Sequence, residues 1–128
     1  MSLLVPMTHD LSDRVIGAAI TVHRQLGPGL LESAYRHFLQ FELVARGVRC
    51  ASEVPVGITY KGNRLEEAFR IDLLIEDRLV VELKSVEKLA PIHTSQLVTY
   101  LKLGNYRSGL LINFNVPVLK DGLKRVLL

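Results

Sequence analysis

Two apolar segments separated by three polar residues constrain the fold of this chain more than any other feature. Residues 70–75 and 79–85 are rich in Leu, Ile and Val, which predicts two strands that are at least half buried in a sheet. The polar residues 76–78 predict a tight connection, so the strands should form an antiparallel hairpin. Charged side chains nevertheless occur inside both segments, at Asp72, Glu82 and Lys84. A carboxylate in a buried strand requires a physical reason.

The length of the connection decides whether the two acids meet. Side chains alternate between the faces of a strand, and directly opposed antiparallel residues share a face. A three-residue connection opposes Asp72 to Glu82 and puts Lys84 on the same face. A two-residue connection would oppose Asp72 to Val81 and send Glu82 to the other face. The interpretation therefore requires a turn of odd length or a bulge.

Two carboxylates about 5 Å apart on one sheet face repel, and each resists ionisation unless a cation lies between them. Mg²⁺ prefers oxygen ligands and usually takes one or two carboxylates, so we expect it at Asp72, Glu82 and the Leu83 carbonyl, with Mn²⁺ as a substitute. The metal would activate a water, while Lys84 holds that water or stabilises developing negative charge. An ordinary charge cluster, with the acids paired to Arg70 and Lys84, is the alternative.

These residues resemble a known motif. Ile71-Asp72, followed after nine residues by Glu82-Leu83-Lys84, is similar to the Asp and Glu-X-Lys signature of the PD-(D/E)XK nuclease superfamily. Ile71 stands where the superfamily name has Pro. The resemblance implies a restriction-endonuclease-like α/β fold and a metal-dependent nuclease.

A second motif lies earlier in the chain. Residues 29–35, Gly-Leu-Leu-Glu-Ser-Ala-Tyr, resemble the Gly-X-X-Glu-X-X-Tyr signature of the GxxExxY family of small nuclease-like proteins, and residues 22–28 and 111–117 are also similar to that family. The resemblance implies that Glu32 reaches the site as a third carboxylate and metal ligand. The alternative is an acid favoured in the first turn of a helix by the macrodipole. Tyr35 is expected to pack, with its hydroxyl hydrogen-bonded.

A polar stripe is predicted on the helix over residues 92–103. His93, Gln96 and Tyr100 share one face at helical spacing. Gln96-X-X-X-Tyr100 resembles a motif of recombination-type members of the superfamily, in which this helix lies beside the metal site. Gln96 and Tyr100 would then grip a phosphate or orient Lys84. A solvent-facing polar surface is the alternative.

The remaining segments predict one α/β domain over residues 1–128, with a mixed central sheet flanked by helices. Pro55 interrupts strand-like sequence, which favours an edge position or a bend. The charged residues 65–70 should project beyond the core. The expected elements are helices over 11–26, 30–46 and 92–103, and strands over 48–54, 56–60, 64–75, 79–85, 106–113 and 123–128, the last as a strand or a tail.

Composition limits the partners. The net charge is +3, and residues 101–128 hold five Lys or Arg against one Asp, a cluster that could follow a phosphate backbone. A solubilising rim around a C-terminal strand is the alternative. For the nuclease that the resemblance implies, DNA is the preferred substrate and RNA is left open. No apolar run approaches the roughly 20 residues that span a bilayer, and residues 3–7 are too short for a signal peptide. The single Cys50 fits a reducing cytoplasm. A homodimer is left open.

We therefore expect a Mg²⁺-dependent nuclease, and the alternative is a non-catalytic module of the same fold that binds nucleic acid or a protein. Other chemistries fit less well. The four His are far apart and Cys50 is alone, so no zinc spacing occurs. No Gly-rich phosphate loop follows a strand, and the absence of Trp leaves little surface for stacking sugars.

Overall fold

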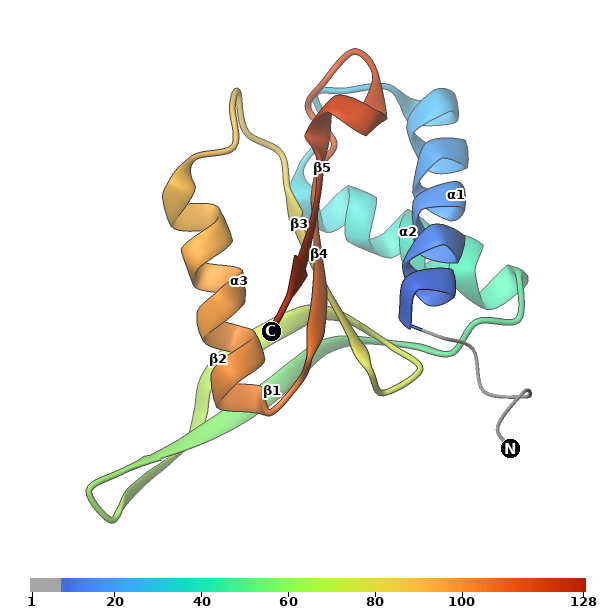
Figure 1. Cartoon of the computed structure of the whole chain (residues 1–128). Helices are drawn as coiled ribbons and strands as arrows, with labels where there is room; N and C mark the ends of the chain where they lie inside the picture. Colours follow the sequence, from blue (N-terminus) through green and yellow to red (C-terminus); the bar gives the residue numbers. More distant parts are fainter. Residues whose placement is uncertain (1–7) are drawn as a thin grey trace.

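The computed structural model describes residues 8–128 (Figure 1), so the segment 3–7 that was considered above as a signal peptide lies outside the described residues. Its elements follow one another as α1 (Thr8–Leu26), α2 (Glu32–Ala45), β1 (Cys50–Tyr60), β2 (Asn63–Ile75), β3 (Leu79–Lys84), α3 (Pro91–Gly104), β4 (Ser108–Asn113), a 3-10 turn η1 (Leu119–Gly122) and β5 (Leu123–Leu127).

The described strands form one mixed sheet in the order β1-β2-β3-β4-β5. β3 and β4 are parallel, with α3 as the crossover between them, and the other neighbours are antiparallel. Helices α1 and α2 lie on one side of the sheet and α3 lies on the other (Figure 1). The expected α/β fold with a mixed central sheet is confirmed. None of the described helices combines the length and the apolar character that crossing a bilayer requires.

Each side of the sheet has its own apolar core. The larger one lies under α1 and α2, and its buried members include Val15, Leu39, Leu73, Val81, Leu110 and Phe114. The smaller one lies under α3, where Leu97 and Leu101 pack on Leu74, Val80 and Leu111. β3 and β4 contribute to both cores, which explains why the sequences of these two strands are almost continuously apolar.

β1 and β2 form a long hairpin whose distal half extends away from the rest of the molecule (Figure 1). Residues 61–67 are all exposed, so the projection predicted for the charged part of β2 is confirmed. The predicted break at Pro55 is wrong, because β1 is continuous from Cys50 to Tyr60. The edge position is right, and it explains the continuity, since one side of an edge strand needs no ladder hydrogen bonds.

The helices begin and end within three residues of their predicted limits. The C-terminal segment is a strand rather than a tail, and β5 pairs with β4 from Ser108 opposite Leu127 to Ile112 opposite Leu123. The turn η1 was not predicted. It precedes β5 directly, and its buried Gly122 lies against the Asn113 carbonyl at the end of β4.

Candidate active site

The hairpin register is the one that brings the two acids together. Ile75 opposes Leu79 and Leu73 opposes Val81, so the connection has three residues as required. The backbone ladder stops there, and the next position holds Asp72 and Glu82. These two residues lie at the point where β2 leaves β3, which we call the fork.

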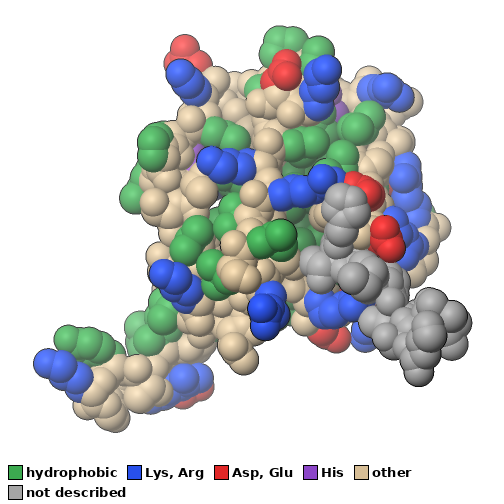
Figure 2. All heavy atoms as spheres, viewed as in Figure 1, with side chains coloured by type: hydrophobic (Ala, Val, Ile, Leu, Met, Phe, Trp, Pro, Cys, Tyr) green, Lys and Arg blue, Asp and Glu red, His purple; other side chains and the backbone are tan. Residues whose placement is uncertain are grey.

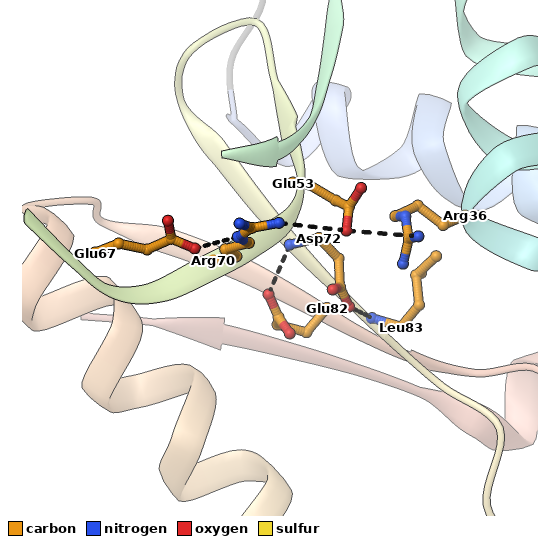
Figure 3. Close-up of polar contacts among 7 residues, drawn as sticks. All are labelled: Arg36, Glu53, Glu67, Arg70, Asp72, Glu82 and Leu83. Atoms are coloured by element: carbon orange, nitrogen blue, oxygen red, sulfur yellow. Dashed lines mark hydrogen bonds and ion pairs between the residues drawn. The ribbon is translucent and has the colours of Figure 1, made fainter. Parts of the chain in front are cut away.

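Each acid binds a backbone amide at the fork (Figure 3). The Asp72 N–H donates to Glu82 Oε1 at 3.1 Å, and the Leu83 N–H donates to Asp72 Oδ2 at 2.8 Å. The two side chains therefore replace the ladder hydrogen bonds that would otherwise continue between the strands. This arrangement fixes both carboxylates beside one another.

Strict alternation of faces, on which the sequence argument relied, does not continue through Asp72. Leu73 and Ile75 pack in the core under α1 and α2, whereas Phe69 and Ile71 pack in the core under α3. Odd-numbered side chains of β2 thus change sides at Asp72. Glu53, on the neighbouring strand at this level, has a φ of 51°, which marks a matching irregularity in β1. The β1–β2 hairpin therefore turns its faces over at the level of Asp72, and β2 diverges from β3 there.

Burial perturbs Glu82. This residue is 4% exposed. Burial and, second to it, the negative charge of Asp72 raise the pKa of Glu82 to about 8, although the hydrogen bond from the Asp72 amide and the charge of Lys84 act in the opposite direction. A cation placed beside Asp72 would therefore strongly stabilise the ionised form of Glu82.

The alternative charge cluster is not what the structure contains. Arg70 pairs with Glu67 and Glu53, and Lys84 donates a hydrogen bond from Nζ to Gln96 Oε1 at 3.0 Å. Within residues 8–128, neither Asp72 nor Glu82 forms an ion pair with a Lys or Arg at 4.0 Å or less.

Two members of the α3 stripe face the site, and the third does not. Gln96 holds Lys84, and Tyr100, one turn later, stacks on Phe69 with ring centroids 4.1 Å apart. Partial burial, followed by the negative charges of Glu82 and Asp72, raises the pKa of Tyr100. His93 instead serves the start of α3, where its Nδ1 accepts a hydrogen bond from the Ala90 N–H.

Glu32 stands apart from the acid pair. It is the first residue of α2, it is exposed, and its carboxylate makes no hydrogen bond or ion pair with another described residue. The part of the chain that the structure describes contains no group of three His, Cys, Asp or Glu able to hold a metal. A link does join this region to the site, because Ser85 Oγ, directly after β3, donates to the Leu30 carbonyl at 2.6 Å. The metal-binding role of Glu32 stays a prediction.

Tyr35 has the structural role expected of it. Its hydroxyl donates to the Gly27 carbonyl at 2.6 Å and accepts from the Leu30 N–H at 3.1 Å. Its ring stacks on Phe114 with centroids 4.4 Å apart and an interplanar angle of 8°. Tyr35 thereby fastens the loop between α1 and α2 to the core.

Sequence reasoning missed Asn113, which supports the segment that follows Lys84. Asn113 is 1% exposed. Its Oδ1 accepts from the Val86 and Asn115 amides, and its Nδ2 donates to the Val86 carbonyl. A polar residue at the end of an apolar strand was the available signal. Lys84 opposes Asn113 in the β3–β4 ladder, so these hydrogen bonds fix the segment that directly follows Lys84.

The family model described as the PD-(D/E)XK nuclease superfamily matches residues 9–126. No curated protein and no solved structure matches significantly.

Proposed function

Since this chain belongs to the PD-(D/E)XK nuclease superfamily, we propose that it is a metal-dependent nuclease that hydrolyses phosphodiester bonds in DNA, with RNA as the alternative substrate. The observation that carries the proposal is the fork, where Asp72 and Glu82 lie side by side while Gln96 holds Lys84 at the end of the same strand. Membership of the narrower GxxExxY family is part of the proposal and rests on the sequence motif.

The donor set suits a hard divalent cation such as Mg²⁺ or Mn²⁺. Carboxylate oxygens are the ligands that Mg²⁺ takes, and it keeps several waters besides. Leu83 adds a further oxygen on this side, because its N–H points toward β2 and the carbonyl of an extended residue points the same way as its N–H. We propose Asp72, Glu82 and the Leu83 carbonyl as ligands, and Glu32 as a fourth that reaches the metal by rotation of its free side chain.

The bound metal would supply an activated water and neutralise charge on the phosphate. Glu82 must release its proton when the cation binds, since its pKa is raised to about 8 in the protein alone. Lys84, held by Gln96, is placed to donate a hydrogen bond to the attacking water or to the developing charge. Tyr100 keeps its hydroxyl proton, because its pKa is raised, and can donate it to a phosphate oxygen.

A non-catalytic module that binds nucleic acid through the C-terminal third remains the second candidate. All five basic residues of that part are exposed, which favours it. However, Arg125 forms an ion pair with Asp13. The Lys and Arg side chains on the face shown in Figure 2 are also spread out, with apolar side chains between them. These features favour the fork over the C-terminal surface as the functional centre.

The test compares cleavage of labelled DNA and RNA with Mg²⁺, Mn²⁺ or EDTA. We expect metal-stimulated cleavage that Asp72→Asn and Lys84→Ala abolish while circular dichroism and thermal melting show a folded protein. Lys102→Ala removes the same charge from an exposed position of α3 and should leave cleavage within about threefold of wild type. Unchanged cleavage by folded Lys84→Ala refutes the mechanism. Salt-sensitive binding without turnover, weakened by Lys102→Ala, supports the module instead.

A further inference from the structure

Two arginines near the fork share one carboxylate (Figure 3). Arg36 of α2 approaches Glu53 Oε1 from Nη2 at 3.7 Å, and Arg70 of β2 approaches the same oxygen from Nη1 at 4.0 Å. Arg70 also binds Glu67 on its own strand. We call Arg36 and Arg70 the arginine pair, and Glu53 is the carboxylate that they share.

This group lies directly beside the acids. Glu53 falls between Ser52 and Val54, which oppose Leu73 and Ile71, and it is therefore level with Asp72 in the sheet. Arg70 precedes Asp72 by two residues on β2. Arg36 lies one turn after Glu32 on α2, so it shares a helix face with the proposed fourth ligand.

The guanidinium of Arg36 makes few polar contacts with the described residues. Its side chain is 24% exposed, and its contact with Glu53 is longer than a hydrogen bond. It makes no hydrogen bond with any other residue that the structure describes. A guanidinium carries five N–H donors in one plane. Because Arg36 uses none of them in a hydrogen bond with a described residue, they are available to a ligand. Exposed ion pairs of such length contribute little to stability, and Glu53 is therefore displaced easily.

We propose that Arg36 and Arg70 bind a phosphate group of the nucleic acid next to the bond attacked at the fork, and that the charge of Glu53 neutralises part of theirs until the substrate arrives. The inference rests on the proposed function, because it needs a nucleic acid at Asp72 and Glu82. Phosphate oxygens accept two parallel hydrogen bonds from a guanidinium, which gives them an advantage over a single shared carboxylate oxygen. The arginines also offset the repulsion between the phosphate backbone and the acids of the fork.

A purely structural role for the same group makes the opposite prediction. If Glu53 only ties α2 to the hairpin, then Glu53→Gln loosens the protein and leaves binding unchanged or weaker. If Glu53 competes with phosphate, then Glu53→Gln tightens binding. Glu66→Gln is the matched control, since Glu66 lies on the same hairpin, pairs with Arg64 and is 85% exposed.

The experiment measures fluorescence anisotropy of a labelled oligonucleotide in EDTA, so that binding is separated from cleavage. We expect Glu53→Gln to bind about three- to fivefold more tightly than Glu66→Gln. We expect Arg36→Ala to bind about tenfold or more weakly than wild type, with Arg36→Lys in between. Arg24→Ala, which removes an exposed charge from the last turn of α1 and lies outside the C-terminal third, is the control. Should Arg36→Ala fail to fold, Arg36→Lys and Glu53→Gln carry the test.

The phosphate has two possible sources, an internal diester or a chain end. Oligonucleotides with and without a terminal phosphate distinguish them, because an Arg36 effect that needs the terminal phosphate assigns the site to chain ends. An effect on both substrates assigns it to the internal backbone.

Equal binding by Glu53→Gln and Glu66→Gln, together with equal binding by Arg36→Ala and Arg24→Ala, overturns the inference. Metal-stimulated cleavage by the wild type would then leave the nuclease proposal intact. Binding that depends on Arg36 without any cleavage supports the inference and overturns the nuclease proposal. A wild-type protein that binds no nucleic acid overturns both.

Discussion

Replacing Glu82 by Gln is expected to remove a large part of the pH dependence of stability in the metal-free protein. Burial and the charge of Asp72 raise the pKa of Glu82 from an ordinary 4.5 to about 8. Between these two values the folded protein keeps a proton that the unfolded chain has released. The free energy of unfolding therefore falls as the pH rises through this window, and it levels off above it.

The size of the effect follows from the two pKa values. Each pKa unit corresponds to about 1.4 kcal/mol, so the wild type should lose about 3 kcal/mol of unfolding free energy between pH 5 and pH 8 through this carboxyl. Gln has nearly the same shape, does not ionise, and keeps an oxygen to accept from the Asp72 amide. Glu82→Gln should match the wild type near pH 5 and exceed it progressively at higher pH.

The assay is urea unfolding followed by circular dichroism, in EDTA, at several pH values from 5 to 8. Glu66→Gln, which removes an exposed carboxylate, serves as the control and should retain the wild-type slope. Added Mg²⁺ should flatten the slope of the wild type, since metal binding requires the ionised carboxylate. Parallel slopes for wild type and Glu82→Gln would show that Glu82 ionises normally and that the fork does not perturb it.

Three further results are expected. Tyr35→Phe removes the hydroxyl that bonds two backbone groups of the α1–α2 loop, and urea titration should show a loss of about 1–3 kcal/mol. Gly122→Ala should unfold at markedly lower temperature than wild type, because its Cβ would lie 2.1 Å from the Asn113 carbonyl oxygen; an unchanged melting temperature would contradict this. Burial raises the pKa of the Cys50 thiol to about 12, so alkylation by iodoacetamide at pH 8 should be much slower in the folded protein than in urea.

The fold was predictable where local sequence decides it. The three-residue connection after Ile75 fixes the hairpin register, and β3 and β4 are apolar enough to be identified as central strands. The edge position indicated by Pro55 is right, whereas the expected break is wrong, because whether Pro interrupts a strand depends on how that strand is paired in the sheet. The pairing of β5 with β4 likewise depends on contacts between segments that each look weak alone.

The sequence indicated that Asp72, Glu82, Lys84 and Gln96 come together, but it did not indicate the backbone geometry that holds them. Helical spacing predicted the polar stripe, and the resemblance to recombination-type members of the superfamily implied that Gln96 could orient Lys84; the hydrogen bond between them agrees. The change of face at Asp72 could not be predicted, because it accompanies an irregularity at Glu53 on another strand. The arginine pair was missed for the same reason, since α2, β1 and β2 come together there only in the folded chain.

The position of Tyr35 bears on how the sequence motif is used in other chains. Tyr35 anchors a loop and stacks on Phe114, and its hydroxyl bonds to the Gly27 carbonyl and the Leu30 N–H rather than to a residue of the fork. A descendant that lost both acids would still need this anchor to fold. A tyrosine at this position therefore reports on the packing of the scaffold, whereas the proposed nuclease activity depends on the residues at positions 72, 82 and 84.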